Sequence, residues 1–321
     1  MSVLVYAESW NGSFKKGTLE AITFAHDTAK KLNTACVAVT LGNISDDKNI
    51  LSNYGADKVL SIDSEFDSCD NKGMASALSQ VAIQENAHII VISNSNTGKC
   101  IGPRLSINLD ASFISNVVDI PSETSPLTIK KKAFSGKAFE IAQSNADHCV
   151  LALSPNAYKI TENPNSSCQF DTFDCTVEDA NVSSEKIEKA SGKISLAEAE
   201  VVISAGRGLK GPENWGMVEE LADLLDAGTA CSKPVSDIGW RPHSEHVGQT
   251  GKAIAPNLYI AIGISGAIQH LAGVNSSKVM VAINTDPEAP FFKAADYGII
   301  GDAFEVVPRL IEEIKNFKSN N

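Results

Sequence analysis

Short apolar runs alternate with segments of helical periodicity in the first part of the chain. The pattern predicts strands at residues 3–7, 35–40, 59–62 and 89–93, and helices at residues 18–31, 48–54 and 74–84. Short apolar strands that alternate with helices are typical of βαβ units, in which helices cover both faces of a parallel sheet. The first half is therefore predicted to be a Rossmann-like α/β domain with a mostly parallel sheet.

The pattern changes after Pro121. Residues 128–141 and 149–153 read as strands separated by turn residues, which predicts an antiparallel addition to the sheet. From about Ser154 to Lys193 the chain lacks periodicity and is rich in Asn, Ser, Asp and Glu. We interpret this stretch as the connection between two domains, part of which packs as an edge strand.

A second α/β pattern begins near Glu200. It predicts strands at residues 201–205, 258–264, 279–283 and 298–300, and helices at residues 215–225, 267–272 and 303–316. The sequence thus predicts a domain at residues 1–193 and a second domain, with a doubly wound parallel sheet, at residues 194–321. Most glycine-bearing loops lie in the second domain, so the chemistry is expected there.

Composition excludes several classes of protein. The chain has 321 residues, too many for one typical domain, with 43% hydrophobic and 21% charged residues. A net charge of -12 argues against a general nucleic-acid or membrane-surface binder. The seven cysteines form no CxxC pair, which favours a reducing compartment. The first residues enter a strand pattern directly, and no apolar run approaches the roughly 18–20 residues of a membrane span. We expect a cytoplasmic protein without direct membrane insertion.

Residues 247–273 carry the strongest functional signal. They contain two glycine-bearing loops, GQTGK and GISGAIQH, on either side of an apolar run predicted to be a buried strand. The second loop leads into a helix expected to begin near Ser265. A strand, a turn of small residues and a helix N-terminus together present free backbone N–H groups, which suit a phosphate or the electron-rich edge of a cofactor ring. We interpret this region as the site of a flavin dinucleotide.

Two other glycine motifs have competing interpretations. Gly206–Gly211 matches GxGxxG after a strand, but Pro212 places the helix beyond the third glycine, and no acidic residue follows at the spacing that a ribose requires. Nicotinamide binding is therefore an alternative, and the charged Arg207 in this loop is the more informative residue. Gly248–Lys252 fails as a P-loop, because its glycines are too close together and Ala253 replaces the Ser or Thr that would bind magnesium.

Other candidate residues favour structural roles. The segment His243–His246 has two histidines and a glutamate, but no further ligand cluster lies nearby, so we predict no metal site. Cys231 stands beside a lysine and is interpreted as a small residue at a strand end rather than as an activated thiol. A lone histidine such as His270 serves packing or capping more often than chemistry.

Four segments nevertheless match a known family in order and spacing. The chain resembles the alpha subunit of electron-transfer flavoproteins, loosely in the first half and closely from Val201 onward. The matching segments are SAGRGLKGPENW (204–215), residues 247–273, VAINTDPEAPFFKAADYGIIGD (281–302) and VVPRLIEEI (306–314).

The resemblance implies that the second domain holds FAD and that the chain pairs with a beta subunit, which in the ordinary type binds AMP. The heterodimer would accept electrons from dehydrogenases, such as the acyl-CoA dehydrogenases of fatty acid beta-oxidation, and pass them through a quinone-reducing acceptor. An electron-bifurcating complex, with a second FAD in place of AMP, is an alternative. The first domain lacks a glycine-rich loop after its first strand, and we expect a docking domain without a nucleotide.

The resemblance also assigns site residues by position. Thr250 would address the flavin N5 region, and His270 with the preceding helix start would face the N1–C2 carbonyl edge. Ser232 and Ser265 would bind the pyrophosphate, and Asn284 with Asp302 the adenosine end. The full expected set is Arg207, Ser232, Lys233, Val247, Gly248, Gln249, Thr250, Ser265, Gly266, Ala267, Ile268, Gln269, His270, Asn284, Asp302 and Ala303.

The chain departs from the family pattern at Lys233. Many members have arginine after the serine that aligns with Ser232. Lysine keeps the positive charge but lacks the planar fork of arginine. Because reduction places negative charge on the flavin ring, a cation at this position would raise the flavin's first reduction potential.

Overall fold

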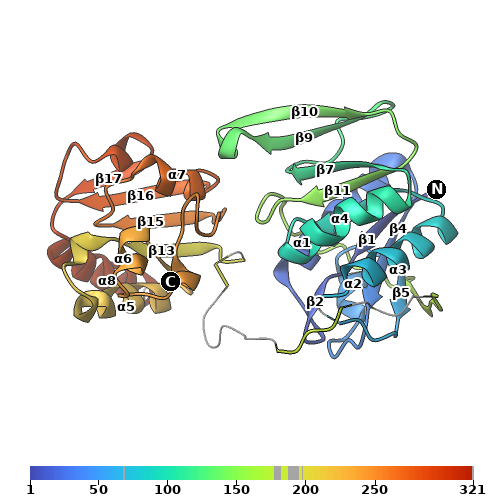
Figure 1. Ribbon diagram of the computed structural model, residues 1–321, viewed down its shortest axis with the longest axis horizontal. Helices are drawn as coiled ribbons and strands as arrows, with labels where there is room; N and C mark the ends of the chain where they lie inside the picture. Colours follow the sequence, from blue (N-terminus) through green and yellow to red (C-terminus); the bar gives the residue numbers. More distant parts are fainter. Residues whose placement is uncertain (68, 177–181, 187–194, 197, 320–321) are drawn as a thin grey trace. The chain divides into compact units, whose positions relative to one another are not determined.

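The computed structural model describes residues 1–67, 69–176, 182–186, 195–196 and 198–319 (Figure 1). The chain divides into two compact units, one of residues 1–133 and 138–188 and one of residues 134–137 and 189–321. Each unit has its own mostly or wholly parallel sheet, so the predicted α/β class is confirmed. Among the described residues, no helix is both long enough and apolar enough to cross a membrane.

Ten described strands form the sheet of the first unit, in the order β10-β9-β7-β11-β6-β1-β4-β5-β12, with β8 paired to β9. The strands are β1 Ser2–Tyr6, β4 Ala35–Leu41, β5 Lys58–Ile62, β6 Ala87–Ser93, β7 Ser112–Val117, β8 Glu123–Thr124, β9 Leu127–Ala133, β10 Ala138–Ser144, β11 Cys149–Leu153 and β12 Gln169–Thr172. The helices are α1 Lys16–Leu32, α2 Asn49–Asn53, α3 Asn71–Gln84 and α4 Asn96–Asn108. A small hairpin, β2 Ser9–Trp10 and β3 Ser13–Phe14, follows β1.

Alternate side chains of β1 enter two apolar layers, one on each face of the first sheet. Val3 and Val5 pack in the layer that contains α1 and α2, whereas Leu4 and Tyr6 pack in the layer that contains α3 and α4. Successive side chains of a strand point to opposite faces, so a sheet covered on both sides requires a continuous apolar run such as this one.

The sheet of the second unit has the order β14-β13-β15-β16-β17, and every neighbouring pair is parallel. The strands are β13 Val201–Ala205, β14 Gly228–Cys231, β15 Leu258–Ile262, β16 Val279–Asn284 and β17 Tyr297–Ile300, and the helices are α5 Gly216–Leu224, α6 Lys233–Asp237, α7 Ile268–Val274 and α8 Ala303–Ser319. Ile203 packs with α5 and α8 on one face, and Val202 packs with Tyr259 on the other. This is the predicted doubly wound arrangement.

Two expectations about individual elements need adjustment, and a third is confirmed. The antiparallel addition consists of β9 and β10, but β11, which we grouped with it, runs parallel between β6 and β7. The predicted edge strand in the 154–193 stretch is β12, which pairs with β5. The helix expected near Ser265 begins at Ile268, because Gly266 has a φ of +85° and Ala267 is not helical.

The sequence pattern missed α4, β7, β14 and α6. Helix α4 contains two glycines and Pro103, which lower its intrinsic helix propensity. Tertiary packing decides its conformation instead. A Cβ added at Gly102 would lie 2.6 Å from the ring of Phe113 and 2.8 Å from Ile92, and one at Gly98 would lie 1.9 Å from a backbone oxygen of Ser93. The glycines are therefore what allows the helix to approach the sheet.

Candidate functional site

The sequence-predicted site residues gather at the carboxyl edge of the second sheet. Arg207 follows β13, Ser232 and the first residue of α6, Lys233, follow β14, and residues 263–267 form the loop after β15. From β13 the chain moves first to β14 on one side and then to β15 on the other, so a topological switch point lies between β13 and β15. Open parallel sheets bind ligands at this position.

Glycines bring the backbones of two loops together at the switch point. The amide of Gly208 donates to the carbonyl of Gly263 over 3.2 Å. A Cβ at Gly208 would lie 2.6 Å from the Cα of Gly263, and one at Gly206 would lie 2.3 Å from its oxygen. The GxGxxG glycines thus serve close packing between loops, and the chain continues from Gly211 into the 3-10 turn Pro212–Trp215 rather than into an α-helix.

The loop after β15 presents unused hydrogen-bond donors. The amides of Ser265, Gly266 and Ala267 donate to no acceptor among the described residues. The loop is held from behind, since the carbonyl of Ser265 accepts from the amide of Phe291 over 3.0 Å. Consecutive backbone amides that point to one side form a concave site for an anion.

The GQTGK loop is wrapped around the imidazole ring of His246. A Cβ at Gly251 would lie 2.8 Å from that ring, and one at Gly248, whose φ is +151°, would lie 3.4 Å from its Nε2. The loop closes through a bond from the amide of Gly248 to the carbonyl of Lys252 over 3.2 Å. The side chains of Gln249 and Thr250 remain exposed at its tip. The glycines of this loop therefore allow close packing on His246.

The amide of Gln249 donates to the carbonyl of Gln269 over 2.7 Å, which joins the GQTGK loop to α7. The segment Val247–Thr250 and the segment Ser265–His270 are therefore brought together, as the sequence-based site requires. Gln269 and Ile268 are exposed, whereas His270 is buried.

His270 lies beneath these loops as a neutral ring. Its Nε2 is 2.8 Å from the hydroxyl of Tyr259, and its Nδ1 is buried beside the backbone of Val247 without a hydrogen bond of ordinary geometry to any described residue. Burial, together with the neighbouring His246, lowers the pKa of His270 to about 4. At neutral pH this residue would act towards a cofactor as a hydrogen-bonding group rather than as a cation.

The remaining expected residues differ in whether their side chains already have partners within the chain. Asn284 donates to the carbonyl of Ile264 over 3.1 Å and accepts from the amide of Asp286, so its side chain already braces the β15 loop. Asp302 caps α8 by accepting from the amide of Phe304 over 3.0 Å. Its other oxygen lies 3.5 Å from the ammonium of Lys210.

Ala303, the first residue of α8, is buried and contributes packing. By contrast, Arg207 and Lys233 are exposed cations whose side chains have no partner among the described residues. Lys233 is the first residue of α6, and its charge contributes to the lowered pKa of His246, behind the larger effect of burial.

This set of donors fits an anionic dinucleotide. The carboxyl edge of the sheet carries three unused amides in the loop after β15 and two exposed cations, Arg207 and Lys233, and the neutral ring of His270 is buried beneath the loops. The pyrophosphate of FAD needs amides and cations, and its ring gains negative charge on reduction. The residues present therefore fit FAD.

Sequence reasoning overlooked the residues that support the loops. Arg241 donates to both carboxylate oxygens of Glu245, each over 2.7 Å, and to Glu219 over 3.0 Å. The sequence signal for this pair was the presence of opposite charges at positions 241 and 245. Such a spacing of four residues is normally interpreted as an ion pair on a helix surface. His246 was considered only as a metal ligand, and Tyr259 only as part of a strand.

Two of the other candidate residues, His243 and Cys231, have structural surroundings in the second unit. Within the described residues, no group of three or more His, Cys, Asp or Glu side chains is placed to hold a metal. His243 bonds the hydroxyl of Ser236 through Nδ1 over 2.8 Å. Cys231 ends β14 and is buried, which raises the pKa of its thiol to about 12. A thiol in this state is not an activated nucleophile.

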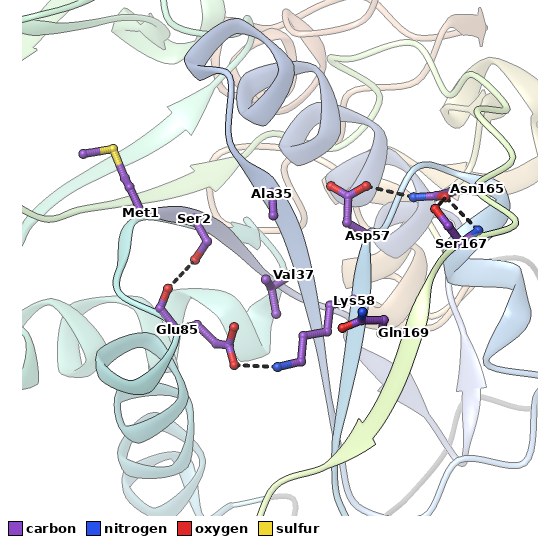
Figure 2. A pocket seen from close by; sticks show the side chains of 10 residues that line it. All are labelled: Met1, Ser2, Ala35, Val37, Asp57, Lys58, Glu85, Asn165, Ser167 and Gln169. Atoms are coloured by element: carbon purple, nitrogen blue, oxygen red, sulfur yellow. Dashed lines mark hydrogen bonds and ion pairs between the residues drawn. The ribbon is translucent and has the colours of Figure 1, made fainter.

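The first unit contains a polar cleft of about 370 Å³, which Figure 2 shows. It lies at the amino ends of β1, β4, β5 and β12, the edge opposite to the one where parallel sheets bind ligands. Its charged groups already pair with neighbours: Lys58 with Glu85 over 2.8 Å, and Asp57 with Asn165 over 2.8 Å. The charged groups of the cleft therefore already have partners within the chain.

Comparison with known families agrees with this geometry. Residues 3–183 match the model of the electron transfer flavoprotein domain, and residues 195–275 match that of the electron transfer flavoprotein FAD-binding domain. The chain belongs to the electron transfer flavoprotein alpha-subunit family. FAD is therefore the cofactor of the second unit, and the family pairs an alpha with a beta subunit. Asn284, Asp302 and Ala303 lie beyond the matched FAD-binding region.

Relatives are similar over nearly the whole length. The electron transfer flavoprotein subunit alpha of Bacillus subtilis is 36% identical over 317 residues, covering 98% of this chain and 97% of the relative. A mitochondrial subunit alpha of Arabidopsis thaliana is 31% identical, covering 99% and 91%. A protein named FixB of Clostridium saccharobutylicum is 30% identical, covering 99% and 97%.

Proposed function

We propose that this chain is the FAD-holding subunit of a heterodimeric electron carrier. The carrier takes electrons from dehydrogenases, such as acyl-CoA dehydrogenases, and delivers them towards the quinone pool through a quinone-reducing acceptor. The observation that supports this most is that the unused amides of Ser265–Ala267 and the exposed cations Arg207 and Lys233 all lie at the carboxyl edge of the second sheet. They lie within the part of the chain that matches the FAD-binding domain family.

In this proposal each group at the edge has a distinct task. The Ser232 hydroxyl and the 265–267 amides bind the pyrophosphate, because amides aligned on one side satisfy phosphate oxygens. Thr250 approaches the N5 region of the ring. Lys233 and the neutral His270 face the edge that gains negative charge on reduction, so that electron uptake becomes more favourable. The bound FAD supplies the redox chemistry, and the protein tunes its potential.

The first unit, which the sequence assigns to residues 1–193, acts as a docking domain and holds no nucleotide. The partner of the whole chain is a beta subunit that binds AMP, and the heterodimer works in the cytoplasm. Two observations support a non-nucleotide role: bulky Trp10 and Phe14 follow β1, and the carboxylate of Glu8 occupies the carboxyl edge of the sheet. This role is distinct from the FAD site and is tested separately.

A sharp test is the cofactor content of the heterodimer, co-expressed with its beta subunit and purified without added nucleotide. We expect a yellow protein with one FAD and one AMP per heterodimer. Two FAD molecules per heterodimer would instead indicate the electron-bifurcating type. A colourless complex that takes up no FAD on reconstitution would contradict both.

The nicotinamide alternative has its own test. Oxidation of NADH by this chain alone, with a small carbonyl substrate, would favour a dehydrogenase that uses Gly206–Gly211. We expect no such activity, because these glycines pack against Gly263 and lead into a 3-10 turn.

A further inference from the structure

Arg241 connects the first turn of α5 with the turn that immediately precedes the GQTGK loop. Its Nε and Nη2 donate to the two carboxylate oxygens of Glu245, each over 2.7 Å, and its Nη1 donates to Glu219 over 3.0 Å. The guanidinium also lies over the ring of Trp215, 5.3 Å from the ring centre. The guanidinium thus joins the start of α5 to the 3-10 turn His243–Glu245.

These contacts are shielded from solvent. The side chain of Arg241 is 17% exposed and that of Glu245 is 10% exposed. Hydrogen bonding to Glu245 raises the pKa of Arg241, so the guanidinium is charged throughout the working range of pH. A bidentate pair fixes orientation as well as distance, and removing one partner leaves a buried charge without compensation.

The pair is joined to the GQTGK loop through the next residues of the chain. His246 follows Glu245, and its backbone bridges Cys231 at the end of β14. The amide of Val247 donates to the carbonyl of Cys231 over 3.1 Å. The ring of His246 is the surface on which Gly248 and Gly251 pack. A displacement of Glu245 would therefore move the loop relative to Ser232 and the rest of the edge.

We propose that Arg241 is a positioning residue for the FAD site. By holding Glu245, it fixes the loop Gly248–Gly251 in the conformation that presents Gln249 and Thr250 to the cofactor. This inference rests on the proposed function, and the guanidinium itself does not touch FAD.

The test uses the co-expressed heterodimer and two substitutions of Arg241. Arg241→Met removes the charge and the fork, whereas Arg241→Lys keeps the charge but cannot donate in a bidentate way. We expect the dissociation constant of FAD to rise about tenfold or more in Arg241→Met, since a misplacement of about 1 Å can cost as much as 100-fold. Arg241→Lys should lie between this variant and the wild type.

Two further readouts separate positioning from mere stabilisation. Amide hydrogen exchange of residues 246–252 should accelerate in Arg241→Met, both before and after FAD is removed. The first reduction potential of the FAD that remains bound should shift, whereas a purely stabilising contact would leave it unchanged. Arg309→Met is the matched control, because Arg309 is an exposed arginine on α8 of the same unit.

The outcomes are distinguishable. If Arg241→Met fails to fold, Glu245→Gln serves as the second variant, since it keeps the shape of the side chain and weakens the same pair. An FAD affinity, loop exchange and potential equal to those of the wild type would overturn the positioning role alone. A wild-type heterodimer that takes up no FAD would overturn the proposed function, and the positioning role with it.

Discussion

The two units of this chain use the same architecture, but their carboxyl edges are built in opposite ways. Both sheets have a switch point, between β1 and β6 in the first unit and between β13 and β15 in the second. At the first, the chain's own side chains fill the edge. At the second, glycine loops leave backbone amides and cations available to a ligand. An α/β fold therefore offers a ligand position, and the side chains decide whether it is used.

Glu8 is the residue that fills the first edge. Its carboxylate accepts from the hydroxyl of Ser95 over 2.6 Å, and the same hydroxyl accepts from the amide of Gly98 in the first turn of α4. Glu8 is 5% exposed. A carboxylate near a helix N-terminus occupies the place where a phosphate would be favoured in other folds of this type. In the second unit, no acidic side chain stands in the equivalent loop, Gly206–Gly211.

The largest expected effect comes from forcing apart the two loops that pack together at the second edge. In Gly208→Ala the new Cβ would lie 2.6 Å from the Cα of Gly263, so the two loops must separate. We expect a loss of about 1–3 kcal/mol of stability, the usual cost of overpacking, together with FAD-free protein after purification. Thermal unfolding and the absorbance ratio of flavin to protein measure the two effects.

The matched control for this variant is Gly216→Ala, at the start of α5. A Cβ at Gly216 meets no atom within 4 Å, and its φ of -53° is helical. This substitution should leave FAD content unchanged and stabilise the protein by about 0.4–1 kcal/mol. Equal FAD loss in both variants would show that the contact between Gly208 and Gly263 is not what holds the site.

The second prediction concerns pH and His270. Its pKa of about 4 in the folded chain lies below the ordinary value of about 6.5, so between these values the unfolded chain binds more protons. The stabilising contribution of the neutral ring is complete above pH 6.5 and is lost as the pH falls towards 4. Between pH 7 and pH 5 the protein therefore loses about 2 kcal/mol of the free energy of unfolding through this residue.

His270→Gln should flatten this dependence, which melting curves of the heterodimer at pH 7, 6 and 5 would reveal. A smaller slope should remain in the variant, because burial also lowers the pKa of His246. If wild type and variant lose stability in parallel over this range, the buried ring at position 270 is not the group that titrates.

The third prediction concerns Glu8, which fills the carboxyl edge of the first sheet. Glu8→Ala removes the acceptor for the partly buried hydroxyl of Ser95, and leaving such a donor unsatisfied costs about 1–3 kcal/mol. The loss of stability should therefore be similar to or smaller than that of Gly208→Ala, while FAD content stays at the wild-type level. Glu8→Gln keeps an acceptor oxygen and should lose less stability. A fall in FAD content would mean that the two edges are not independent.

The sequence predicted most elements because hydrophobic periodicity and burial agree there. The apolar run at residues 3–7, which contains most of β1, is buried at every position. Helix α4 could not be predicted, since its glycines are explained only by the strand residues against which they pack. The GQTGK loop was recognised as a turn, but its dependence on His246 arises from a contact that spacing does not encode. The contacts of Arg241 were missed for a related reason, because its partner Glu219 is distant in sequence.

The smallest expected effect is electrostatic and concerns Lys233. Its ammonium is exposed, so solvent screens its interaction with the flavin ring. A tenfold change in a one-electron equilibrium corresponds to about 59 mV. We expect Lys233→Ala to lower the first reduction potential of bound FAD by less than this, about 20–40 mV in moderate salt. Spectroelectrochemical titration of the heterodimer measures the shift, which should shrink as ionic strength rises.

Lys278→Ala is the control, because Lys278 is an exposed lysine at the amino edge of the same sheet, just before β16. It should leave the potential unchanged. Lys233→Arg should keep the wild-type potential or raise it slightly, since the charge is retained and the planar fork can donate in a bidentate way. Identical potentials in Lys233→Ala and the wild type would mean that the ammonium points away from the ring. The open edge would then depend on its backbone amides rather than on this cation.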